Sequence, residues 1–124
     1  MERSTAQRRA IHKAFEEAGR PLGPNEIFDL ARSDVPGLGI ATVYRAIKSL
    51  LDDGVLTQVD LPGEPPRYEV SGKAHHHYFR CNVCHRVYDV FGCSDGYKTL
   101  APKGFRLDAH ELYLMGRCSN CVAA

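Results

Sequence analysis

Apolar residues recur at intervals of three and four along the first half of the chain. This spacing runs through residues 5–18, 24–31 and 39–53, and it predicts three helices with one apolar face each. Gly54 follows the third segment at the position that commonly ends a helix. Residues 55–60 and 67–70 are predicted strands of a hairpin with a proline-rich loop.

Three helices followed by a hairpin is the element order of a winged helix-turn-helix, in which the last helix enters the major groove of DNA. We therefore predict a DNA-binding domain over residues 1–71. Beyond a short linker we expect strands at 78–81, 87–91 and 106–114 and a short helix at 94–100. Residues 72–124 are thus a second, small α/β domain, and the predicted fold class is α+β.

The charge balance restricts how this chain could bind nucleic acid. Lys and Arg number 16 against 15 Asp and Glu, which excludes a strongly basic coat protein. No apolar run approaches the ~20 residues of a membrane span. DNA binding would need local basic groups, and the candidates are Arg8 and the polar face of the third helix, which carries Thr42, Tyr44, Arg45 and Lys48. The alternative is a solvated face of an ordinary amphipathic helix.

All five cysteines follow residue 80, and four of them form two C-x-x-C pairs. The polar start of the chain does not resemble a secretory signal, so we expect the reducing cytoplasm, where such pairs more often hold a metal than a disulfide. Two pairs complete a tetrahedral set for structural Zn²⁺. A redox-active pair is the alternative. The predicted zinc ligands are Cys81, Cys84, Cys118 and Cys121.

Three consecutive histidines precede the first pair. On a strand, His75 and His77 would share one face, which makes half of a transition-metal site, and His110 could supply a third imidazole. The alternative is a solvated turn. The chain has no H-E-x-x-H motif and no zinc-deaminase pattern, so we expect neither an enzyme nor a small organic substrate.

These features together resemble the ferric uptake regulator family of metal-sensing repressors. The similar segments are Thr5-Ala6-Gln7-Arg8, Ala41-Thr42-Val43-Tyr44-Arg45, Arg67-Tyr68-Glu69, the histidine run before the first cysteine pair, and His110 before the second. The resemblance implies a homodimeric repressor of operator DNA in the cytoplasm, with residues 72–124 as the dimerisation domain. It also implies a regulatory divalent metal, Zn²⁺ or Fe²⁺, which sets the domain arrangement and operator affinity and so controls metal homeostasis.

The chain departs from the family pattern at the metal site near the hinge. Pro21 and Tyr78 stand where the family has histidines, so Glu69, His76 and Asp89 are left as a possible degenerate site. The second family site is matched by His75, His77 and His110. The resemblance implies a further ligand for it from the short helix, and Cys93 and Asp95 are the candidates.

Two alternatives remain within this interpretation. An aspartate at the position of Asp89 is typical of the peroxide-sensing branch of the family. The chain could also be a non-sensing, zinc-containing DNA-binding module. The number of metals bound per chain, and the dependence of DNA affinity on the second metal, would separate these classes.

Overall fold

The computed structural model describes the backbone of residues 2–92 and 95–123, and the side chains of residues 5–92 and 96–123. It divides into two compact units, residues 1–73 and 74–124. The predicted α+β fold class is confirmed.

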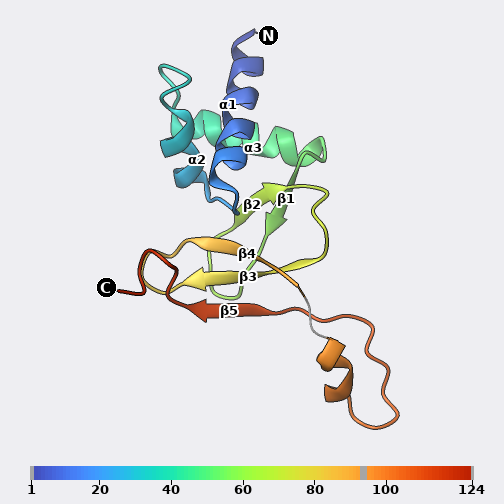
Figure 1. The fold of residues 1–124 in the computed structure, drawn as a ribbon. Coiled ribbons are helices and arrows are strands. Elements are labelled where there is room, and N and C mark those ends of the chain that lie inside the picture. The colour runs from blue at the N-terminus through green and yellow to red at the C-terminus, as the bar shows by residue number, and fades with distance from the viewer. Residues whose placement is uncertain (1, 93–94, 124) are drawn as a thin grey trace. The chain divides into compact units, whose positions relative to one another are not determined.

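The first unit contains three helices and a hairpin (Figure 1). The helices are α1 (Glu2–Ala18), α2 (Pro24–Ala31) and α3 (Ile40–Asp52). Gly54 lies just beyond α3 with φ of +76°, a backbone conformation that glycine adopts without steric cost. The first helix begins three residues earlier than the predicted start at residue 5.

The hairpin pairs β1 (Leu56–Val59) with β2 (Arg67–Val70) in antiparallel register. Leu22, in the connection between α1 and α2, adds a bridge to this sheet. Its backbone N–H and C=O each form a 2.9 Å hydrogen bond with Tyr68. The bridge attaches the helices to the hairpin by backbone as well as by side-chain contacts.

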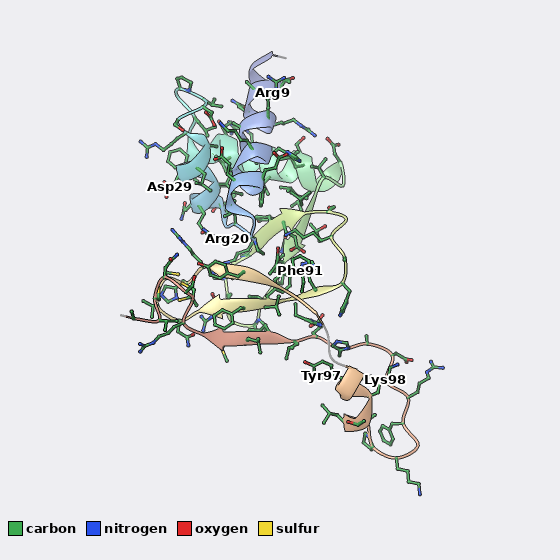
Figure 2. All side chains as sticks on the ribbon, in the orientation of Figure 1. Arg9, Arg20, Asp29, Phe91, Tyr97 and Lys98 are labelled. Atoms are coloured by element: carbon green, nitrogen blue, oxygen red, sulfur yellow. The ribbon has the colours of Figure 1, made fainter. Side chains whose placement is uncertain are left out.

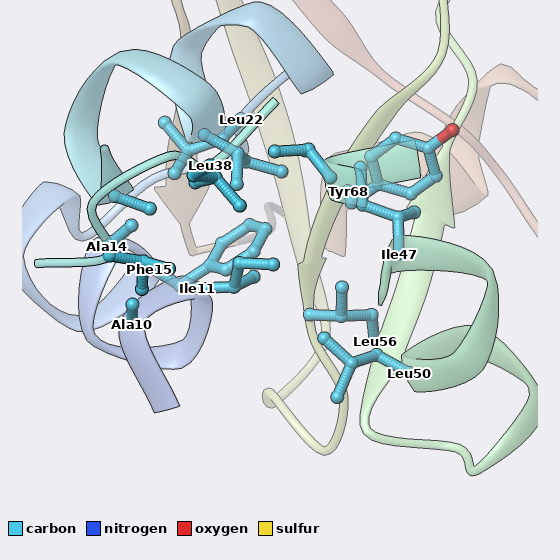
Figure 3. Packing of buried hydrophobic residues seen from close by; sticks show 14 residues of the cluster. Ala10, Ile11, Ala14, Phe15, Leu22, Leu38, Ile47, Leu50, Leu56 and Tyr68 are labelled. Atoms are coloured by element: carbon cyan, nitrogen blue, oxygen red, sulfur yellow. The ribbon is translucent and has the colours of Figure 1, made fainter. Parts of the chain in front are cut away.

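The core of the first unit collects the apolar faces of all three helices against the hairpin (Figure 3). Its members are nearly inaccessible to solvent, and burial of such side chains contributes about 1.5–3 kcal/mol each. They include Ile11, Phe15, Leu22, Ile27, Val43, Ile47, Leu50, Leu56 and Tyr68.

The second unit contains a three-stranded sheet of order β4-β3-β5. Its strands are β3 (His76–Cys81), β4 (Val87–Phe91) and β5 (Tyr113–Gly116), and a 3-10 helix, η1 (Asp95–Leu100), precedes β5. The central strand β3 is antiparallel to β4 and parallel to β5.

The predicted strand over residues 106–114 is wrong for most of its length, because β5 begins only at Tyr113. The register explains this result. Tyr113 lies beside Tyr78, and β3 begins only two residues before Tyr78. Residues 106–110 therefore extend past the start of β3, and no strand among the described residues pairs with them to form a ladder.

Candidate metal centres

The four paired cysteines converge in the second unit, and their Sγ atoms all lie within 4.8 Å of one another. Cys84 Sγ and Cys118 Sγ are 3.8 Å apart. Cys81, Cys118 and Cys121 are buried, whereas Cys84 is exposed. Four thiolate donors around one point are the ligand set of a structural zinc, so this group fits the ion that the family implies.

Backbone donors favour ionisation of the thiol at the centre of this cysteine group. Burial opposes the charge on Cys81, but its Sγ accepts N–H hydrogen bonds from Cys118 (3.4 Å), Cys84 (3.5 Å) and Val83 (3.4 Å). These bonds lower the pKa of Cys81 to about 5. The Cys81 thiolate is thus available as a metal ligand at neutral pH.

The pKa values of the other two buried thiols, Cys118 and Cys121, shift in opposite directions. A hydrogen bond from the Tyr88 hydroxyl lowers the pKa of Cys118. Hydrogen bonding to Cys118, together with burial, raises the pKa of Cys121 to about 12. The raised pKa disfavours the Cys121 thiolate in the protein alone, and a divalent cation would supply the charge that stabilises it.

A second convergence lies at the other ends of the same two parallel strands. His75 and His110 each lie three residues before the paired residues Tyr78 and Tyr113. The Nε2 atom of His77 is 3.1 Å from that of His75 and 3.2 Å from that of His110. These three residues form the histidine group, and their facing nitrogens could bind one transition-metal ion.

His77 is the buried member of the histidine group, with only 4% of its surface exposed. Burial is the main cause that lowers its pKa below the ordinary 6.5, and the neighbouring His75, His110 and His76 add to the shift. Its imidazole is therefore neutral at physiological pH, the form that binds metals.

The predicted hinge ligands are found in both units. His76 Nε2 lies 3.5 Å from Asp89 Oδ1 in the second unit. Glu69 lies in β2 of the first unit, where its buried carboxylate is 3.6 Å from Lys73 Nζ. Their joint action on a metal stays a prediction. Cys93 and the side chain of Asp95, the predicted extra ligands, lie outside the described residues.

The predicted DNA-reading residues lie on α3, away from the face that packs into the core. Tyr44, Arg45 and Lys48 are exposed and Thr42 is half-buried, while Arg45 Nη2 donates a 3.1 Å hydrogen bond to Thr42 Oγ1. Arg8 forms a hydrogen bond and an ion pair with residues at the end of the same helix. Its guanidinium lies 2.9 Å from Ser49 Oγ and 2.9 Å from a carboxylate oxygen of Asp53.

The cysteine group and the histidine group are each contacted by a tyrosine that we did not predict from the sequence. Tyr88, on β4, packs against the cysteine group, and the ring of Tyr97, on η1, stacks on His110. The alternation along residues 87–91 could have placed Tyr88 on one sheet face, but no periodicity pointed to Tyr97.

Known proteins share both the sequence pattern and the fold. Residues 2–115 match the model of the ferric uptake regulator family. The ferric uptake regulation protein of Campylobacter upsaliensis is 28% identical over 122 residues, which cover 94% of this chain and 78% of that protein.

Two solved structures extend the comparison. A zinc-bound manganese uptake regulator superposes with a TM-score of 0.76 at 26% identity, covering 90% of this chain and 87% of that one. The ferric uptake regulator from Francisella tularensis with iron gives 0.68 at 26% identity, covering 93% and 90%. Among the described residues, no helix is long and apolar enough to cross a membrane. The match to the family model over residues 2–115 shows that the chain belongs to the ferric uptake regulator family, a family of metal-binding transcription regulators and not of enzymes.

Proposed function

We propose that this protein is a metal-dependent, DNA-binding repressor that works as a homodimer in the cytoplasm and controls metal homeostasis. The cysteine group would hold a structural Zn²⁺, and the histidine group would bind the regulatory ion. The exposed face of α3 would contact the operator. The two units are the DNA-binding and dimerisation domains of this proposal.

The observation that carries the proposal is that the Nε2 atoms of His75 and His110 both face Nε2 of the buried His77. The Nε2 atom of His77 lies within 3.2 Å of Nε2 of both His75 and His110, and a single ring proton on His77 can serve only one of these two contacts. A divalent cation would satisfy all three lone pairs at once. The exposed member, His75, leaves the group open to an ion from solvent.

Regulation follows if the ion binds one arrangement of the two units more tightly than the others. Metal binding then shifts the population towards that arrangement, and by linkage operator DNA strengthens metal binding by the same factor. Couplings of this kind typically change affinity by about 5- to 150-fold.

The chemistry of the ligands limits the choice of regulatory ion. Imidazole suits both Zn²⁺ and Fe²⁺, so the histidine group alone favours neither. A thiolate from Cys93 would favour Zn²⁺, whereas a carboxylate from Asp95 would suit Fe²⁺. A metal titration with Fe²⁺, Zn²⁺, Mn²⁺ and Ni²⁺ would identify the ion.

The decisive experiment measures DNA affinity against metal content. DNA bound by the metal-loaded protein is selected from a random pool, and its affinity is then measured at fixed salt with one and with two metals per chain. We expect the second metal to raise the affinity, His77→Ala to abolish the rise while keeping one zinc, and His12→Ala to behave as wild type. His12 is the matched control because it lies on α1 beside Glu16, outside the histidine group.

Other outcomes would favour the alternative functions. Tight DNA binding with a single zinc per chain, unchanged by further metal, would identify a non-sensing module. Loss of DNA affinity only after the iron-loaded protein is treated with peroxide would identify a peroxide sensor. The His76–Asp89 pair would then be the first candidate for its iron site.

A further inference from the structure

Tyr97 covers one face of a predicted metal ligand. Its ring stacks on the His110 imidazole, with the ring centroids 4.8 Å apart and an angle of 23° between the planes. Figure 2 shows Tyr97 on η1, beside Lys98. The centroid of the His110 ring also lies 5.4 Å from that of His75 and 5.0 Å from that of His77.

His110 needs such support more than His77 does. His77 lies within β3, where backbone pairing with Val90 of β4 fixes its position. His110 lies outside any helix or strand, between η1 and the start of β5 at Tyr113. An imidazole on an irregular segment rotates more freely unless its neighbours restrain it.

The stacking restrains this imidazole without using its nitrogens. Ring nitrogens lie in the plane of the imidazole, and Nε2 of His110 faces Nε2 of His77 at 3.2 Å. Tyr97 instead occupies the flat face of the ring, and a tyrosine ring is no competitor for the metal at neutral pH. The contact therefore fixes orientation and leaves the ligand atom available.

We propose that Tyr97 is a positioning residue of the histidine group, and that its ring holds the His110 imidazole in the orientation needed to bind a divalent cation together with His75 and His77. The inference rests on the proposed function and adds a residue to its regulatory site.

The test uses Co²⁺ as the probe, added to full-length protein whose cysteine group is already filled with zinc. Binding is followed by the visible absorption of the bound Co²⁺. We expect Tyr97→Phe to bind within twofold of wild type, because it keeps the aromatic face. Tyr97→Leu should bind about 3- to 10-fold more weakly, in line with the usual contribution of an aromatic pair, and its absorption spectrum should change. Leu100→Ala, an exposed position on the same 3-10 helix, is the control and should match wild type.

The outcomes separate this inference from the proposed function. Equal Co²⁺ affinity and spectrum for wild type and Tyr97→Leu would overturn the role of Tyr97 alone. A wild-type protein that takes up no second metal would overturn the proposed regulatory site, and the positioning role with it.

A second measurement covers the case in which Tyr97→Leu does not fold. Ring currents from Tyr97 should shift the His110 ring protons upfield in the NMR spectrum of wild type and of Tyr97→Phe. Unshifted His110 protons in both proteins would also overturn the inference.

Discussion

Cys81 lies directly beside Gly116 in the parallel register of β3 and β5. Both strands therefore reach their carboxyl ends at the same edge of the sheet, and the chain turns back after each of them. The two turns close in the same way, with His85 N–H bonded to Cys81 O at 3.0 Å and Val122 N–H bonded to Cys118 O at 3.0 Å. The cysteine group thus depends on the pairing of two segments that are far apart in sequence.

We first predict that Cys118→Ser loses zinc and the dimer together. A structural zinc contributes on the order of 10 kcal/mol to folding in small zinc domains, and serine is a far weaker ligand than thiolate. Zinc content by elemental analysis and mass by analytical ultracentrifugation check this. A zinc-loaded dimer of the variant would contradict the assigned ligands.

Gly116→Val should weaken zinc binding without altering a ligand. A Cβ at this position would lie 3.0 Å from Cζ of Phe79 on the neighbouring strand, and a branched side chain needs more room still. Overpacking of this kind costs about 1–3 kcal/mol, which we expect to appear as faster loss of zinc to a chelator. Met115→Val, at the exposed neighbouring residue, is the control and should retain its zinc like wild type.

Tyr88→Phe should reduce zinc affinity about 10-fold, the lower end of the effect of losing a hydrogen bond to a metal ligand. The Tyr88 hydroxyl donates to Cys118 and lowers the pKa of that thiol, so its removal makes the thiolate more costly. Competition with a chromophoric chelator measures the affinity. Unchanged affinity would show that Tyr88 only packs against the group.

Arg45→Ala should weaken binding to the selected DNA by about 10-fold or more, the range for loss of one base contact by arginine. The same loss is expected for Tyr44→Ala, and neither change should unfold the protein, since both side chains are exposed. Arg106→Ala removes the same charge from an exposed position in the second unit and serves as the control. Wild-type binding by Arg45→Ala at matched salt would exclude this face from recognition.

Tyr68 should make the first unit sensitive to alkali. Burial, with smaller effects from Tyr44 and Asp60, raises the pKa of Tyr68 above its ordinary 10.0. The folded state then keeps a proton that the unfolded chain releases, so the stabilising effect is complete below pH 10 and is lost as pH rises through the folded pKa. Urea unfolding between pH 8 and 11 should show a shallower loss of stability for Tyr68→Phe. Equal slopes would mean that Tyr68 ionises normally in the fold.

The helices could be predicted from sequence because helix geometry is local and places residues three and four apart on the same buried face. Val43, Ile47 and Leu50 lie on one face of α3 and are buried, as their spacing indicates. A strand also needs a neighbour, and this information is absent from its own sequence. For that reason the strand expected over residues 106–114 was mostly wrong, and β3 begins two residues earlier than expected, at His76.

The ligand groups were partly predictable for a related reason. A C-x-x-C turn brings its own two sulfurs together locally, so Cys81 and Cys84 could be recognised from spacing. The contacts of Tyr88 and Tyr97 join segments whose proximity follows from the sheet order and from the course of the chain after η1. No local pattern encodes either relationship.

The parallel pairing of β3 with β5 also has a consequence for how the protein acquires its metals during synthesis. Each ligand group draws on residues before 85 and on residues from 110 onward. A nascent chain that has emerged only as far as residue 109 contains His75 and His77 of the histidine group and one pair of the cysteine group, so neither ligand set is complete. If both groups bind metal as we propose, neither site can be completed before the second half of its ligands has been synthesised.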